Sequence, residues 1–332
     1  MLFLALGKAK LAGVPLLGGR RPRYTLEMPS PKVVRNPHPR RITEERNAAS
    51  KDLDRMSSLE IIRLMNREDE KVARAVGRQI PNIAKAADEI VERMKAGGRL
   101  IYVGAGSSGR IGVLDASECP PTFGVSANLV RAVIAGGKKA VTQSVEGAED
   151  QPGEGARDLR KIRLSKLDSV VGIAASGSTP YVLGAIAYAK RRGALTIGVA
   201  TNRRVPLAKS AKIAITPEVG PEILAGSTRL KSGTSQKMVL NMLSTAVMVR
   251  LGHAYDNLMI DVGEANEKLR ERAKWILKEA SARDVSAVTR ALRQSGHDLR
   301  LALIMLKRGV SANQARRILL ESRGNLRKAL GE

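Results

Sequence analysis

Residues 99–124 read R-L-I-Y-V-G-A-G-S-S-G-R-I-G-V-L-D-A-S-E-C-P-P-T-F-G, an apolar run followed by closely spaced glycines and serines. Its apolar start, residues 100–103, predicts a strand that is buried on both faces of a parallel sheet. The glycines that follow let the chain turn tightly and approach a ligand closely. Ser107 and Ser108 stand where a helix begins, and the free N–H groups and dipole of a helix start favour an anion.

The same stretch predicts where that helix ends. Pro120 and Pro121 cannot continue a helix, so we expect it to run from about Gly109 to Ser117. Glu118 would then stand at the break, with its carboxylate turned toward the mouth of the glycine-rich loop.

The spacing G-x-G-x-x-G also fits a dinucleotide site, but a second signal is missing. Such a site needs an acidic residue about 20 positions on, at the end of the second strand. The second predicted strand, residues 129–134, ends in Ala-Gly-Gly. A second small-hydroxyl loop follows the apolar strand 170–174, and it contains Ser176, Gly177, Ser178 and Thr179. Two such loops favour a compact phosphorylated ligand over a dinucleotide.

Composition narrows the class of protein. The chain has 332 residues, of which 43% are hydrophobic and only 2% are aromatic, so its core is aliphatic. It has no apolar run of about 18 residues, the length that would predict a membrane span. The single cysteine, Cys119, fits a reducing compartment and predicts a packed thiol rather than a nucleophile. The three histidines have no metal-ligand spacing, so we expect neither a metal nor a cofactor.

The net charge of +25 raises the question of nucleic-acid binding. The excess lies at the two ends, with +7 in residues 1–40 and +10 in residues 268–332. Few aromatic side chains are present to stack on bases. Solvated basic faces are therefore the simpler interpretation, and no nucleic-acid partner is expected.

Apolar strands alternate with helical segments through the middle of the chain. We expect strands near residues 100–104, 129–134, 169–174, 194–199 and 212–215, which predicts an α/β fold with a parallel sheet flanked by helices. Helices are expected before the sheet at about 58–65 and 69–94, with Pro81 kinking or splitting the second, and after it at about 232–251. Residues 1–40 show no periodicity and predict a disordered extension.

The tail is helical and contains a repeat. The segments 295–303 and 322–330 match at five positions with an offset of 27 residues, which predicts two related helical hairpins. We expect three parts, a basic extension (1–40), a central α/β domain with N-terminal helices (41–267) and a small all-helical domain resembling a ubiquitin-associated bundle (268–332).

A cluster of carboxylates lies between the second and third predicted strands. Residues 145–150 read V-E-G-A-E-D, which a solvated acidic turn would also explain. Glu149 and Glu118 follow neighbouring strands, however, and both can border one crevice. Two carboxylates in different surroundings can divide general-acid and general-base roles.

Several long motifs carry a resemblance to a known family. They are residues 104–124 and 145–150, quoted above, G-I-A-A-S-G-S-T-P-Y-V-L-G (172–184), G-P-E-I-L-A-G-S-T-R-L-K-S-G-T-S-Q-K-M-V-L-N-M-L-S-T (220–245) and N-L-M-I-D-V (257–262). Together they resemble the N-acetylmuramic acid 6-phosphate etherases of the sugar-isomerase (SIS) family. The resemblance runs from about Ile42 to Leu330.

The resemblance implies a function and a site. The family cleaves the lactyl ether of N-acetylmuramic acid 6-phosphate during cell-wall recycling, by elimination and then hydration, without metal or nucleotide. It implies Glu118 as the proton donor and Glu149 as the second acid/base. Ser107, Ser108 and the loop from Ser176 to Thr179 would hold the sugar phosphate. The family further implies a cytoplasmic homodimer.

Two questions stay open at this stage. Ser178 stands where many family members have an arginine, and Arg110, Arg229 or Lys231 could supply that charge instead. The same fold also serves in a non-catalytic sugar-phosphate sensor, the glucokinase regulatory protein, so a regulatory role is the alternative to an enzyme. Both glutamates in their motifs favour the enzyme.

Overall fold

The structure is a computed structural model that describes residues 42–262, 267–322 and 324–332. The basic extension expected at residues 1–40 lies outside the described residues, so its predicted disorder stays a prediction.

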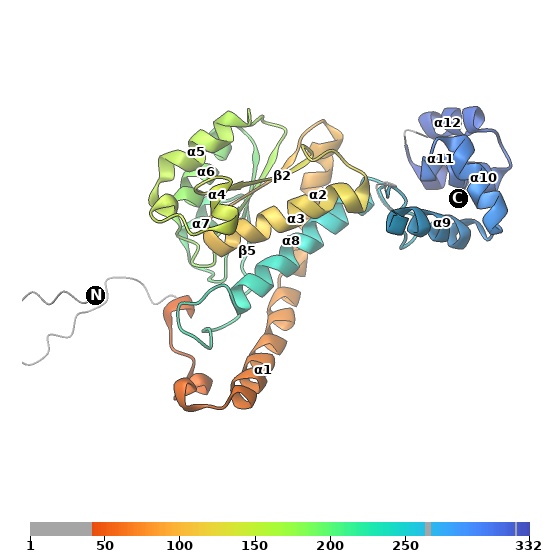
Figure 1. Cartoon of the computed structure of the whole chain (residues 1–332). Helices are drawn as coiled ribbons and strands as arrows, with labels where there is room; N and C mark the ends of the chain where they lie inside the picture. Colours follow the sequence, from red (N-terminus) through yellow and green to blue (C-terminus); the bar gives the residue numbers. More distant parts are fainter. Residues whose placement is uncertain (1–41, 263–266, 323) are drawn as a thin grey trace, which may run out of the picture. The chain divides into compact units, whose positions relative to one another are not determined.

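A five-stranded parallel sheet organises the chain (Figure 1). The strand order is β2-β1-β3-β4-β5, and every residue of β1, β3 and β4 is buried, as expected for a sheet covered on both faces. The strands are β1 Leu100–Gly104, β2 Val130–Ile134, β3 Ser169–Ile173, β4 Leu195–Val199 and β5 Ile213–Ile215. The predicted parallel α/β fold is confirmed.

Helices cover the two faces of the sheet and pack on alternate side chains of its strands. Leu100 and Tyr102 of β1 belong to one apolar cluster, and Ile101 and Val103 belong to the other. The first cluster is completed by α1 Ser58–Gly77, α2 Ile80–Lys95, α3 Gly106–Phe123 and α8 Lys231–Arg250. The second is completed by α5 Pro152–Lys161, α6 Pro180–Arg191 and α7 Pro206–Ser210. The short helix α4 spans Lys139–Thr142, and the 3-10 turns are Ile42–Glu44, Ala48–Ser50, Leu53–Arg55 and η4 Ala148–Asp150.

The helix α3 runs past its two prolines, so its predicted end near Ser117 is wrong. Packing decides the end of this helix, because Cys119 and Phe123 of the last turn are buried in the first apolar cluster. The helix stops at Gly124, which has a left-handed φ of 63° and donates its N–H to the carbonyl of Pro120 at 2.9 Å. Buried contacts offset the hydrogen bonds that the prolines cannot make.

The helices before the sheet divide differently from the prediction. The helix α1 is continuous as far as Gly77. The prediction that one helix ends and the next begins near residue 68 is therefore wrong. The next helix begins at Ile80 with Pro81 in its first turn, where no N–H is needed. Pro81 therefore splits the helical segment, as expected. Ser57 and Glu60 form a capping box at the start of α1.

The C-terminal helices have an apolar cluster of their own. It contains Tyr255 and Ile260 from the segment after α8, together with residues of the helices α9 Glu267–Ser281, α10 Val285–Ser295, α11 Leu299–Arg308, α12 Ala312–Glu321 and α13 Leu326–Leu330. The predicted repeat is confirmed as two helix–turn–helix units. Asp298 caps α11 and Asn325 caps α13, each accepting the N–H three residues on at 3.0 Å.

Candidate active site

The strands β1 and β3 end side by side, at the point where the chain connections diverge. β1 pairs with β2 on one side and with β3 on the other, and Gly104 stands opposite Ile173. In this strand order ligands bind in the crevice beyond the carboxyl ends of β1 and β3. The structure therefore brings the two predicted hydroxyl-rich loops to one crevice.

The first loop leads directly into α3. Ser107 and Ser108 lie in the first turn of this helix and are half-buried. The N-cap residue, Ala105, offers no side-chain acceptor to the first N–H groups. An anion in the crevice would meet these N–H groups, both hydroxyls and the positive end of the helix dipole.

The second loop leads from β3 into α6 and is shaped by its own hydrogen bonds. The Ser178 N–H and hydroxyl both lie within hydrogen-bond distance of the Ser176 hydroxyl oxygen, at 3.3 and 3.2 Å. Gly177 has a φ of 69° and its carbonyl accepts the N–H of Leu207 at 2.9 Å. Thr179 occupies the N-cap position of α6 without making a side-chain cap. Its hydroxyl is thus available to a ligand.

Sequence reasoning missed two polar residues that support the second loop. Thr201 and Asn202 follow β4, and their side chains donate to the carbonyl of Ala175 at 2.9 and 3.1 Å. The side-chain Oδ1 of Asn202 also accepts a hydrogen bond from the N–H of Ile42 at 3.0 Å. Their only signal in the sequence is a Thr-Asn pair at the end of an apolar strand, which is weak because it also fits an ordinary turn.

Glu118 lies far along α3, so the prediction that its carboxylate faces the mouth of the loop is wrong. It is exposed in the interior of the helix, 10 residues after Ser108. At 1.5 Å per residue the two positions are about 15 Å apart along the helix axis. Leu114, one turn earlier, is also exposed, at 52%. The structure does not bring Glu118 to the crevice of its own chain.

Glu149 lies on the α6 side of the sheet. It belongs to the turn η4, which packs against α6, the helix that follows the second loop. Ala148 of this turn packs on the apolar cluster beneath, while Glu149 is exposed. The backbone that carries Glu149 is therefore tied to the element that carries Ser176 to Thr179.

Cys119 is a buried thiol in a polar network behind α3. Burial, with the nearby charges of Asp115 and Glu118, raises the pKa of Cys119 to about 12, which excludes a thiolate nucleophile at neutral pH. The Asp115 carboxylate accepts hydrogen bonds from the hydroxyl of Tyr102 at 2.7 Å and from Asn241 and Ser244 at 2.6 and 3.1 Å. This network joins β1, α3 and α8.

The three basic candidates for the missing arginine differ in their surroundings. Arg110 binds the carbonyl oxygens of residues 140, 141 and 143, so it holds the segment after β2. Lys231 is 2% exposed and forms an ion pair with Glu68 at 2.5 Å. Arg229 is exposed and, within the described part of the chain, forms no ion pair or hydrogen bond. Only Arg229 is both charged and unengaged.

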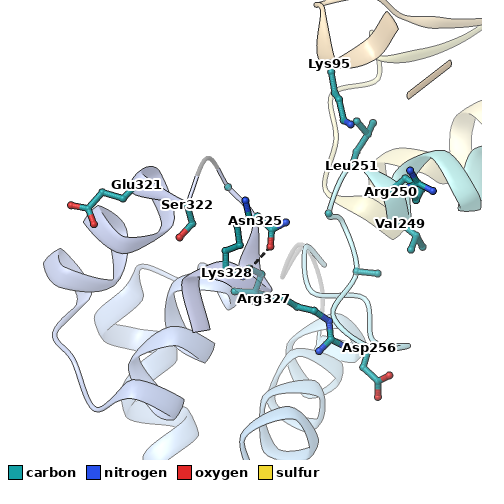
Figure 2. A pocket seen from close by; sticks show the side chains of 14 residues that line it. Lys95, Val249, Arg250, Leu251, Asp256, Glu321, Ser322, Asn325, Arg327 and Lys328 are labelled. Carbon is teal, nitrogen blue, oxygen red and sulfur yellow. Dashed lines mark hydrogen bonds between the residues drawn. The ribbon is translucent and has the colours of Figure 1, made fainter. Parts of the chain in front are cut away.

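Cavity size does not locate the site. A cavity of about 1110 Å³ is lined by the end of α8, by Lys95 and by residues around α13, including Arg327 and Lys328 (Figure 2). None of the predicted site residues lines it.

Among the described helices, none is long and apolar enough to cross a bilayer.

Two protein-family models match this chain. The glucokinase regulatory protein N-terminal SIS domain matches residues 82–190, and the SIS domain matches residues 150–246. These ranges contain the whole of the parallel sheet and both hydroxyl-rich loops. The fold and the crevice thus define a SIS-domain protein.

Three relatives of this chain bear the name N-acetylmuramic acid 6-phosphate etherase. The relative from Clostridium beijerinckii is 51% identical over 290 residues, which cover 87% of this chain and 95% of the relative. Those from Caldanaerobacter subterraneus and Pectobacterium atrosepticum are 50% and 51% identical over 289 residues, covering 87% of this chain and 94% and 95% of the relatives. The chain belongs to the N-acetylmuramic acid 6-phosphate etherase family, which confirms the resemblance inferred from its motifs.

Proposed function

We propose that this chain cleaves the lactyl ether of N-acetylmuramic acid 6-phosphate, giving N-acetylglucosamine 6-phosphate and D-lactate. The proposal is carried by one observation, the pairing of two hydroxyl-rich loops at the ends of β1 and β3, in a chain 51% identical to a named etherase. Ser107 and Ser108 of the first loop bind the 6-phosphate together with the N–H groups of α3. Ser176, Gly177, Ser178 and Thr179 of the second loop complete the phosphate site.

The chemistry requires two carboxylates at the other end of the sugar. In the ring-opened sugar the aldehyde acidifies the C2 proton, which Glu149 removes as general base. The C3–O bond then breaks, and Glu118 donates a proton to the departing lactate oxygen. Water adds to C3 of the resulting double bond and a proton returns to C2. Placing the two groups on different elements separates their acid and base roles.

The site is shared between two copies of the chain. The distance of about 15 Å along α3 separates Glu118 from the phosphate loop of its own chain. In the sugar, only about three carbon–carbon bonds of about 1.5 Å separate C6 from C3, which carries the oxygen that Glu118 protonates. A homodimer in which Glu118 enters the partner's crevice resolves this mismatch. The exposed Leu114 beside Glu118 supports a partner over this face of α3. Leu59 and Ile62 on α1 are further exposed apolar side chains.

Two conservative substitutions test the catalytic roles. Glu118→Gln and Glu149→Gln keep the shape of each side chain but remove its proton-transfer chemistry, so each should lower D-lactate release by about 10²- to 10⁴-fold. A coupled lactate assay on variants with wild-type melting temperatures measures the loss. Glu146→Gln, an exposed glutamate in the same loop, is the matched control and should stay active. Near-full lactate release by either test variant would remove that residue from the mechanism.

The coupled lactate assay also distinguishes an enzyme from the regulatory alternative, because a sensor binds the sugar phosphate without releasing lactate.

We further propose a cytoplasmic location, which the single unpaired cysteine fits. In domain terms, we propose a SIS domain with its N-terminal helices over about residues 41–267 and a ubiquitin-associated-like helical domain over about residues 268–332, with Tyr255 and Ile260 packing on the second.

A further inference from the structure

The helices α5 and α6 touch backbone to backbone through two glycines. A β-carbon at Gly184 of α6 would lie 1.9 Å from the carbonyl oxygen of Pro152 in α5. A β-carbon at Gly155 of α5 would lie 2.1 Å from the carbonyl oxygen of Tyr181 in α6. The contact is reciprocal, since each helix contributes a glycine against a carbonyl of the other. No other residue type fits at either position without moving one helix.

This contact between α5 and α6, the crossing, connects the two parts of the proposed site, the turn that carries Glu149 and the second hydroxyl-rich loop. Pro152 opens α5 three residues after Glu149, and Tyr181 lies two residues after Thr179. The turn η4, which carries Glu149, also packs on α6. The two helix starts therefore set how far Glu149 stands from the second loop.

A hydrogen bond between side chains of α5 and α6 also stabilises the crossing. The hydroxyl of Tyr181, which is fully buried, donates to Asp158 of α5 at 2.8 Å. The carboxylate of Glu149 has no such support, because it makes no hydrogen bond or ion pair with any of the described residues. The path of the backbone therefore sets where the Cα of Glu149 stands.

We infer that Gly155 and Gly184 are positioning residues, which act by setting the distance between Glu149 and the sugar bound at the second loop. The inference rests on the role proposed for Glu149. An alanine at 184 has to widen the contact from 1.9 Å to the ordinary 3.4 Å, and the start of α5 gives way. A misplacement of about 1 Å in a catalytic group can lower a rate by about 10²-fold.

The test compares glycines that differ only in their surroundings. Gly184→Ala and Gly155→Ala should lower kcat for lactate release by about 10- to 100-fold. KM, and inhibition by inorganic phosphate as a probe of the loops, should stay at the wild-type values. Gly153→Ala is the control, because a β-carbon there has no atom within 4 Å. Alanine favours a helix over glycine, so an effect on helix stability alone would act in the opposite direction.

A double-variant cycle separates positioning from a general structural defect. If Gly184 acts through Glu149, Gly184→Ala should cost little further activity in the Glu149→Gln background. An equal loss in both backgrounds would overturn the inference. Wild-type activity of Glu149→Gln would instead overturn the role proposed for Glu149.

A milder variant keeps the inference testable if the alanines impair folding. Tyr181→Phe keeps the buried ring and removes only the hydrogen bond to Asp158, so kcat should fall by a smaller factor with KM unchanged. Wild-type kcat in a folded Tyr181→Phe variant would show that the crossing does not position Glu149.

Discussion

Glu68 is a buried carboxylate whose partners come from three parts of the chain. Its oxygens accept hydrogen bonds from Lys231, Lys71 and Asn47. Burial opposes ionisation of Glu68, but these partners outweigh it and lower its pKa from 4.5 to about 2. Since the folded pKa lies below the unfolded one, the carboxylate stabilises the fold above about pH 4.5 and this contribution is lost as the pH falls toward 2.

Removing one member of the Glu68–Lys231 ion pair should destabilise the fold. Glu68→Gln leaves Lys231 buried without its counter-charge, which typically costs about 3–5 kcal/mol in the free energy of unfolding. The double variant Glu68→Gln/Lys231→Met should recover a large part of that loss. Urea unfolding at neutral pH measures both, and repeating it down to about pH 3 should show a shallower decline for Glu68→Gln than for the wild type. A double variant no more stable than Glu68→Gln would contradict this assignment.

At the residue scale, what the sequence could predict was local. The positions of the serines after β1 and β3 could be predicted because hydroxyls and glycines sit together after a strand, where sheet geometry already places ligands. That these serines bind a phosphate stays a prediction. Asn202 and Glu68 were missed because their partners are distant in sequence. Asn202 contacts a residue 27 positions away, and Glu68 pairs with one 163 positions away. No local pattern marks such a pair.

At the scale of elements, α8 depends on a carboxylate outside it. Glu222 is fully buried and accepts the N–H groups of Lys231 and Ser232, the first two residues of this helix, at 3.0 and 2.9 Å. Glu222→Gln removes the charge that complements the helix dipole and turns an amide donor toward an N–H group. We expect a loss of about 1–3 kcal/mol in the free energy of unfolding. Chemical denaturation measures it.

A surface glutamate provides the control for that prediction. Glu218 forms an ion pair with Arg203 at 2.7 Å, and both side chains are partly exposed. Such pairs contribute about 0–1 kcal/mol, so Glu218→Gln should change stability little. If Glu222→Gln were no more destabilising than Glu218→Gln, the capping role of Glu222 would be refuted.

The sequence located strands better than helix ends. Each of the five strands lies within about one residue of its expected position, because short apolar runs in a parallel sheet are unambiguous between turn signals. The end of α3 was misplaced because proline rules describe an isolated helix. Here the burial of Phe123 and Cys119 stabilises the helix beyond Ser117, as far as Phe123. This extension keeps Glu118 within the helix and away from its own crevice.

At the scale of the whole molecule, the shared site can be tested by mixing two defective chains. If Glu118 acts in the partner's crevice and Glu149 in its own, a heterodimer of Glu118→Gln with Glu149→Gln has one intact site and one that lacks both groups. Purified through two different tags, it should release lactate at about half the wild-type rate, whereas both homodimers stay inactive. Light scattering should give about twice the chain mass of 35.7 kDa.

The alternative arrangement gives the opposite outcome. If both glutamates served the same chain's crevice, every site in the heterodimer would lack one of them, and mixing would restore nothing. A monomer that turns over substrate would equally exclude the shared site. The geometry of α3 favours restoration, because a rigid helix that begins at Gly106 cannot return Glu118 to a phosphate bound at its own first turn.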